Sequence, residues 1–428
     1  MASAGKCLKA KVDLPAPAGP IKMTRAVAGT FITLMGMFEG IRLSREDRVM
    51  MALLVFVPAT IVAAHTGAPG WLQFVLSVAA VIPVAALIAS STEALARRLG
   101  GKVGGLLNAT FGNLPDLLIG IFGVQKGLIP LVKATLVGAL ISNSALIMGV
   151  CFLVAGLVHR RPRFDRAEAG HHSVLMMLTV AAILFPTAGA SVICGRTCAG
   201  TSNASTIQGV SVGIAIVLLI AYLAYVVYGI FGLESLGGRP TEGRETRVFK
   251  AGDPARPAPW PVAFSLALLI LTGLALIPVT DILTSGVASV TKALGWTEVF
   301  VGMIIVANAG NVAEAYAAIK FAIRKPGTPD GSPVGDSGLD LALGIASASS
   351  IQIATFVMPV VVLFSLFFKP MNLVFTFVEV SILALLVVVF THTAQDGESN
   401  WLEGAQLLVL YAMAAVVFFA LPASAFGG

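Results

Sequence analysis

Charged side chains are scarce in this chain. Only 12% of its 428 residues are Asp, Glu, Lys or Arg, whereas 57% are hydrophobic and the mean hydropathy is +0.91. Soluble globular domains carry about 25% charged residues, so this composition excludes an ordinary soluble protein and places most of the chain in lipid. A chain of this length then holds several membrane spans, since each needs roughly 20 apolar residues.

The sequence patterns of several functional classes are also missing. The chain shows no zinc-ligand spacing, no nucleotide-binding loop and no Ser-His-Asp set, so we expect no cofactor. Four cysteines are too few for a disulfide scaffold. Cys194 and Cys198 are near neighbours in one loop and either form a disulfide or remain free thiols. The net charge of +6 comes from basic residues in connecting loops, which does not indicate nucleic-acid binding.

Long apolar runs predict an all-α membrane protein with eleven transmembrane helices. The spans must be helical because lipid offers backbone N–H and C=O groups no other partner. They cover residues 49–66, 71–94, 104–125, 129–158, 172–193, 206–232, 261–291, 297–321, 338–367, 371–391 and 401–421.

The placement of lysine and arginine predicts the orientation of these spans. If the N-terminus is inside, the inner segments hold nearly all the basic residues. The outer ends and loops then hold only Lys126, Lys133, Arg196, Lys292 and Lys369. We therefore expect residues 1–48 to form a cytoplasmic tail and the C-terminus to lie outside. No eukaryotic sorting signal is clear, which favours a bacterial cytoplasmic membrane.

A polar linker divides the spans into two halves. Residues 233–260 are rich in Gly, Pro and charge, and they separate a first half (49–232) from a second half (261–421). Without the first span, five spans stand on each side. Because five is odd, the second set inserts upside down relative to the first. The pattern predicts one extra helix plus two inverted five-helix repeats, an architecture of many secondary transporters.

Each half carries the same short pattern inside an apolar span. Residues 112–116 read Gly-Asn-Leu-Pro-Asp and residues 310–314 read Gly-Asn-Val-Ala-Glu. Each places an asparagine and a carboxylate three residues apart, on one helix face. Ionisable residues within spans are candidates for function. No basic residue lies deep in a predicted span, and the nearest ones, Lys133 and Lys320, are close to span ends. Neither Asp116 nor Glu314 therefore has an obvious basic partner.

The two patterns together supply the ligands of a hard cation. Such ions prefer carboxylate and amide oxygens, which Asp116, Glu314, Asn113 and Asn311 provide. The helix that follows each pattern is expected to line the same site, with side chains of Asn143, Ser349 and Gln352. Burial and mutual repulsion favour the protonated form of two close carboxyl groups, whereas a bound divalent cation favours the ionised form. Cation and protons then compete for one site, which is the physical basis of antiport.

Two further acids have two interpretations each. Glu93 ends an apolar span and is either a relay for cations or a solvated helix end. Glu379 lies within the tenth predicted span. It is either a second proton site or the partner of neighbouring Ser and Thr side chains.

These patterns resemble the calcium/proton exchanger (CAX-type) family of the cation/Ca²⁺ antiporter superfamily. The resemblance covers about residues 50–421, and its strings are Ser-Thr-Glu at 91–93 and residues 104–113, 300–302, 310–314, 350–354 and 396–404. It implies eleven helices with two inverted repeats, and exchange of cytoplasmic Ca²⁺ or Mn²⁺ for protons by alternating access. It also implies that Asp116 and Glu314 bind the cation, and it matches Asn113 and Asn311 to family positions.

The first motif departs from that family. The family usually has Glu at the position of Asp116 and no proline before it, whereas a Pro-acid pair is typical of the sodium/calcium exchanger branch. The prediction is therefore a secondary active Ca²⁺/H⁺ antiporter, with a Na⁺-coupled Ca²⁺ exchanger of the same fold as the alternative. An intramembrane enzyme or a non-transporting scaffold is the third hypothesis. It is disfavoured because enzyme sites rarely need two inverted copies. The predicted partners are a divalent cation, protons or Na⁺, and membrane lipid.

Overall fold

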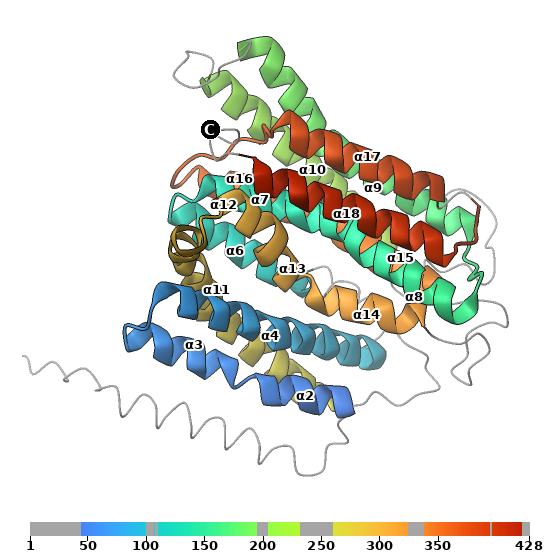
Figure 1. The fold of residues 1–428 in the computed structure, drawn as a ribbon, viewed down its shortest axis with the longest axis horizontal. Helices are drawn as coiled ribbons and strands as arrows, with labels where there is room; N and C mark the ends of the chain where they lie inside the picture. The colour runs from blue at the N-terminus through green and yellow to red at the C-terminus, as the bar shows by residue number, and fades with distance from the viewer. Residues whose placement is uncertain are drawn as a thin grey trace, which may run out of the picture. The chain divides into compact units, whose positions relative to one another are not determined.

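A computed structural model describes residues 44–99, 107, 110–194, 204–231, 260–323, 338–393 and 396–421. This part of the chain is helical, with one isolated antiparallel bridge between Arg163 and Glu398 and no strand (Figure 1). Nearly all of the predicted tail and linker lies outside the described residues, and so does Cys198. The question of a disulfide between Cys194 and Cys198 therefore also falls outside them.

The first half folds into helices that follow the apolar runs. Two stretches depart from a single straight helix: α2 and α3 are separated by a short turn, and η1 is a π-helical segment between α7 and α8. The elements are α2 (Arg45–Leu53), α3 (Phe56–His65), α4 (Gly70–Leu99), α6 (Leu114–Gln125), α7 (Ile129–Ile141), η1 (Ser142–Ile147), α8 (Met148–His159), α9 (Arg166–Cys194) and α10 (Ala204–Phe231).

The second half has a similar order of long helices and π-helical segments. One π-helical segment, η5, follows α15 at the position that η1 holds after α7. The elements are α11 (Val262–Leu294), α12 (Glu298–Phe300), η4 (Val301–Val306), α13 (Ala307–Gly310), α14 (Val312–Ala322), α15 (Leu339–Gln352), η5 (Ile353–Val357), α16 (Met358–Ser365), α17 (Phe377–Thr393) and α18 (Trp401–Ala420).

Eight helical stretches in the described residues are long and apolar enough to cross a membrane. A ninth is the stretch from Glu298 to Ala322, which bends by 57° at Asn311. Two shorter apolar helices, α6 and α17, are also present in the described residues. Each predicted span contains a helix. The tenth helix starts later than predicted, at Phe377, because residues 366–376 around Lys369-Pro370 form an irregular loop.

The buried side chains form two hydrophobic cores. The smaller core joins α4 and α11, which pack along each other, with contributions from α6, α7 and η4. The larger core lies among α7, α8, α9, α15, α16, α17 and α18. In Figure 1, α4 lies below α14, and α3 and α2 follow one another beneath α4, while α8 and α18 run together above. Residues of α6 and of the η4–α14 stretch contribute to both cores.

Candidate cation site

The first motif occupies the start of helix α6. Asn113 is the residue before the first turn, with φ −99° and ψ 21°, and Asp116 lies within that turn. Pro115 is tolerated there because the first N–H groups of a helix have no intrahelical acceptor. The positive end of the helix dipole favours a carboxylate at this position. Asn113 and Asp116 are both buried, each only 2% exposed.

The second motif has the same construction at the start of α14. Asn311 interrupts the helix between α13 and α14, with φ −86° and ψ 1°, and Glu314 lies in the first turn of α14. Asn311 is 1% exposed, and the Glu314 Oε2 atom is inaccessible to solvent. Each motif therefore places an asparagine at a helix break and an acid one turn later. The spacing of the two residues agrees with the prediction from sequence, which did not include the break.

The two motifs meet in the interior. A Cβ atom built on Gly310 would lie 2.9 Å from the Asp116 Oδ1 atom, so the Asp116 carboxyl rests against the backbone one turn before Glu314. The carboxyl groups of Asp116 and Glu314 are close enough to interact electrostatically. The absence of a side chain at Gly310 is what allows this approach.

Hydrogen bonds connect each motif to the helix that follows the other one. The Asn113 Nδ2 group donates to Gln352 Oε1 at 2.6 Å, and the Ser349 hydroxyl donates to Asn113 Oδ1 at 3.2 Å. In the other direction, Asn311 Nδ2 donates to Asn143 Oδ1 at 3.1 Å. All five of these side chains are predicted site residues, and the structure brings them together.

Several buried oxygen atoms at this junction have no hydrogen-bond partner among the described residues. They are Asp116 Oδ1, Asn311 Oδ1 and Glu314 Oε2. Buried polar groups are normally paired, so three unpaired acceptors in one place are unusual. Carboxylate and amide oxygens are the ligands that a hard cation prefers. Among the described residues no group of three or more His, Cys, Asp and Glu is placed to hold a metal ion.

The two other predicted acids lie on helices α4 and α17. Glu93 is on the exposed side of α4. Glu379 is buried at the start of α17, where its carboxylate accepts hydrogen bonds from the N–H and hydroxyl of Thr376, both at 2.8 Å. Lys133 contributes a nearby positive charge. Of the two interpretations of Glu379, this geometry favours a local partnership with a neighbouring threonine.

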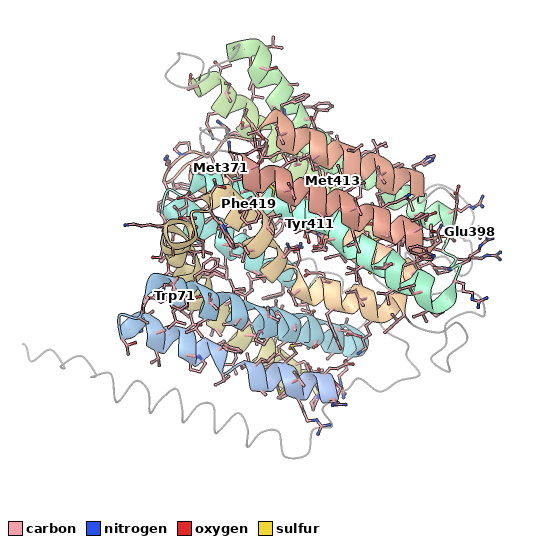
Figure 2. All side chains as sticks on the ribbon, viewed as in Figure 1. Trp71, Met371, Glu398, Tyr411, Met413 and Phe419 are labelled. Atoms are coloured by element: carbon pink, nitrogen blue, oxygen red, sulfur yellow. The ribbon has the colours of Figure 1, made fainter. Side chains whose placement is uncertain are left out.

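A second polar link beside the site was not predicted. Asn308 lies one turn before Asn311, and its Oδ1 accepts a hydrogen bond from the Ser142 hydroxyl at 2.6 Å. Its Nδ2 donates to Ile304 O and to the hydroxyl of Tyr411 on α18, both at 2.6 Å. Figure 2 labels Tyr411 on its helix. The sequence signal was a third amide on the face that carries Asn311 and Glu314. Its spacing of three residues from Asn311 could have identified it.

The sequence matches known proteins over most of its length. Residues 69–231 and 264–420 match the family described as Sodium/calcium exchanger protein. The Ca(2+)/H(+) antiporter of Aphanothece halophytica is 32% identical over 390 residues, which cover 87% of this chain and 97% of that protein. The Ca(2+)/H(+) antiporter ChaA of Bacillus subtilis is 32% identical over 366 residues, covering 85% of this chain and 97% of that protein.

A solved structure agrees with these matches. The crystal structure of the selenium-substituted Ca2+/H+ antiporter protein YfkE superposes with a TM-score of 0.70 at 30% sequence identity. The match covers 88% of this chain and all of that one.

Proposed function

The chain belongs to the sodium/calcium exchanger protein family, and we propose that it is a secondary active antiporter that exchanges Ca²⁺ for protons. On this proposal it is a transporter and not an enzyme. The observation that carries the proposal is the buried junction where the Asp116 carboxyl lies against Gly310, one turn before Glu314, beside unpaired amide and carboxyl oxygens. The relatives named Ca(2+)/H(+) antiporter give the same cation and coupling ion.

The proposed ligands are Asp116, Glu314, Asn311 and Asn113. The amide nitrogen of Asn311 donates to Asn143, which leaves its Oδ1 atom unpaired and available to a cation. Asn113 Oδ1 already accepts one hydrogen bond, from Ser349. We therefore assign Asn311 the stronger ligand role. Asn143, Ser349 and Gln352 act by fixing the orientation of the two asparagine amides.

The proposed architecture is the eleven-helix arrangement with two inverted repeats. Adding the bent stretch and the two short apolar helices to the eight long ones gives that number. The matching helix breaks at Asn113 and Asn311, and the matching π-helical segments η1 and η5, support the repeat. The distribution of Lys and Arg supports a cytoplasmic N-terminus and an outside C-terminus, and we retain a bacterial cytoplasmic membrane as the host.

Alternating access fits the division of the interior into two cores. The motif helices border both the α4–α11 core and the larger core. A displacement of one core against the other would open the site to one side of the membrane at a time, around a fixed midplane site. Mn²⁺ has the same preference for oxygen ligands and is proposed as a second cargo.

Flux measurements on purified protein in liposomes test the proposal. An imposed pH gradient should drive Ca²⁺ uptake, and both Asp116→Asn and Glu314→Gln should abolish it. The matched control is Asp281→Asn, the same chemical change at an acid in α11 that pairs with Lys126 at 2.6 Å, away from the motifs. This control should transport normally. Uptake that persists in both site variants would rule out the assigned residues.

A second liposome experiment distinguishes proton coupling from the Na⁺-coupled alternative. That alternative rests on the Pro115-Asp116 pair of the first motif. An imposed Na⁺ gradient, with the pH gradient collapsed by a protonophore, should drive no Ca²⁺ uptake. Uptake under that condition would favour sodium coupling. The absence of flux under either gradient would contradict transport altogether.

A further inference from the structure

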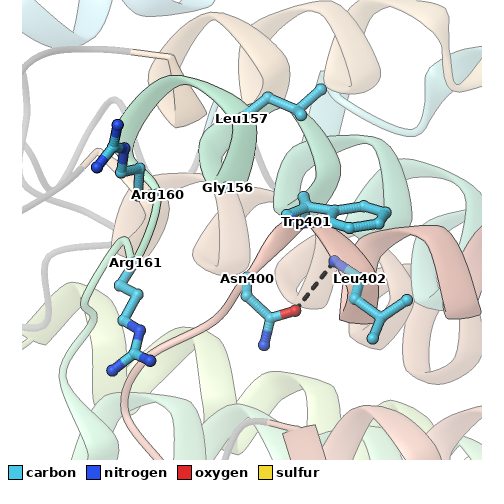
Figure 3. Close-up of a pocket in the computed structure, with 7 residues that line it drawn as sticks. All are labelled: Gly156, Leu157, Arg160, Arg161, Asn400, Trp401 and Leu402. Carbon is cyan, nitrogen blue, oxygen red and sulfur yellow. Dashed lines mark hydrogen bonds between the residues drawn. The ribbon is translucent and has the colours of Figure 1, made fainter.

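An open pocket lies where helices α8 and α18 meet at one end of the bundle. Its volume is about 520 Å³, and its lining residues are Gly156, Leu157, Arg160, Arg161, Asn400, Trp401 and Leu402. Figure 3 shows the two arginines on one side of the opening, Trp401 and Leu402 on the other, and Asn400 between them. This pocket is separate from the motif asparagines and acids.

A glycine brings the two sides of this pocket together. A Cβ atom on Gly156 would lie 2.7 Å from the backbone carbon of Asn400 and from the Cα atom of Trp401. No larger residue fits there without moving backbone, so α18 begins directly against the last turn of α8. The arginines that follow α8 and the indole of Trp401 therefore line the same pocket.

The two guanidinium groups are not neutralised by the acids nearby. Arg160 and Arg161 are exposed and make no ion pair with any residue in the described ranges. Glu398 lies 3.7 Å from Arg163, and Glu403 accepts a hydrogen bond from Asn400 at 2.8 Å. Both neighbouring acids are thus engaged elsewhere, which leaves the pocket with two positive charges.

The backbone at Arg160 is strained. Its φ is +62°, the only positive φ at a non-glycine residue in the described part of the chain. L-residues with side chains rarely adopt this region, whereas glycine does so at no cost. A residue that keeps a strained conformation at a pocket is a candidate for function. A glycine would end α8 with less strain, so the arginine side chain itself is the feature to explain.

The pocket lies at the boundary of two candidate spans. The stretch Ile129–His159 ends beside it, and Trp401–Ala420 begins in it. Trp401, Leu402 and Leu157 are each half or more exposed. Tryptophan at the end of a span typically lies at the level of the lipid headgroups. Apolar side chains toward the acyl region and arginines toward the surface match the two parts of a phospholipid.

From this arrangement we infer that the pocket binds the phosphate-containing headgroup of an anionic phospholipid. Arg160 and Arg161 hold the phosphate, since the planar guanidinium group suits phosphate oxygens. Trp401 and Leu402 contact the adjoining glycerol and acyl carbons. Basic pockets between transmembrane helices are known to bind anionic headgroups. The site is independent of the proposed transport function.

Native mass spectrometry of the full chain in a neutral detergent tests this site. Phosphatidylglycerol should bind the unmodified protein, while zwitterionic phosphatidylcholine and inorganic phosphate at equal concentration should bind much more weakly. In the double variant Arg160→Gln/Arg161→Gln, the apparent affinity for phosphatidylglycerol should fall about fivefold per arginine, or about 25-fold in all. The matched control, Arg45→Gln/Arg48→Gln, removes two exposed arginines from α2 and should bind as the unmodified protein does.

A second variant keeps the test decisive if the double variant does not fold. Arg160→Gly relieves the positive φ, so it should raise the unfolding temperature in lipid-free detergent while lowering the affinity for phosphatidylglycerol about fivefold. Undiminished phosphatidylglycerol binding in these variants would overturn the proposal. Equal binding of inorganic phosphate would also overturn it, because the ligand would then be a free anion.

Discussion

Replacing Gly310 by alanine should weaken Ca²⁺ binding while the fold remains intact. Gly310 ends helix α13, and an added Cβ would lie 2.9 Å from Asp116 Oδ1 and 3.5 Å from its Cγ. Ordinary van der Waals contact begins at 3.4 Å, so the carboxyl group must retreat by about 0.5 Å. Functional groups need to be held within about 0.5 Å of their productive position, and this shift moves a proposed ligand by that amount.

The size of the effect follows from the cost of overpacking. One extra methyl group in a tightly packed interior costs about 1–3 kcal/mol. If that cost applies to the cation-bound state, Ca²⁺ affinity falls about 5- to 150-fold. Exchanging glycine for alanine in a helix contributes about 0.5–1 kcal/mol of stability in the opposite sense. The unfolding temperature without Ca²⁺ should therefore change little.

The matched control is Gly273→Ala on α11. There the added Cβ would meet Leu114 Cδ2 at 3.7 Å, an ordinary contact beside the first motif. Two measurements apply to both variants: the Ca²⁺ concentration for half-maximal uptake in liposomes, and the rise in unfolding temperature with Ca²⁺, which reports binding. The Gly310 variant should need more Ca²⁺ in both assays, and the Gly273 variant should match the unmodified protein.

The reasoning also predicts how Gly310→Ala combines with Asp116→Asn. If the methyl group acts through the Asp116 carboxyl, it should add little to the binding defect of the Asp116 variant, because coupled residues are not additive. An unchanged Ca²⁺ dependence in Gly310→Ala would refute the placement of Asp116. Additive defects would show that the methyl group acts through another part of the site.

Two further predictions concern polar links outside the proposed ligands. Asn308→Leu should lower the free energy of unfolding by about 1–3 kcal/mol because it leaves the Ser142 and Tyr411 hydroxyls without this partner, and Tyr411→Phe should lower it by about 1 kcal/mol. In chemical denaturation, Tyr411→Phe should cost almost nothing once Asn308 is replaced. Full additivity of the two changes would contradict the link. Lys133→Met should destabilise by about 1–3 kcal/mol, since Lys133 Nζ donates to Asn372 Oδ1 at 2.6 Å and Val374 O at 2.8 Å. Glu379→Gln should keep pH-driven flux with the same pH dependence, whereas loss of flux would restore its role as a second proton site.

Apolar runs were sufficient to locate the helices, because lipid leaves the backbone few alternatives. The sequence was less informative where contacts with distant segments determine the start or the break of a helix. The sequence analysis assigned residues 371–376 to a span. In the structure they form a loop whose N–H groups donate hydrogen bonds to side chains. Leu373 N–H donates to the Ser211 hydroxyl and Phe375 N–H to the Thr187 hydroxyl. Those partners are more than 160 residues away in sequence, so no local pattern could reveal them.

The sequence predicted the motif residues and their meeting in one site, whereas it did not predict which side chains bond to one another. Carboxyl and amide groups stand out in apolar spans because burying them without a partner costs free energy. That Asn113 bonds to the helix after the second motif, and Asn311 to the helix after the first, depends on how the halves pack. Asn308 was not predicted because its role is to bond to Ser142 and Tyr411, which come from two other helices.

Charge balance at the junction connects this geometry to the stoichiometry of exchange. Asp116 and Glu314 together carry two negative charges when ionised. The lysines nearest to span interiors are occupied elsewhere, Lys133 with Asn372 and Lys320 with Glu46. An isolated buried charge is costly, and one Ca²⁺ or two protons each leave the site neutral. We therefore expect one Ca²⁺ to exchange for two protons without net charge movement. Under a fixed pH gradient in liposomes, a K⁺ diffusion potential set with valinomycin should leave the Ca²⁺ uptake rate unchanged, and a rate that rises or falls with that potential would contradict a site neutral in both states.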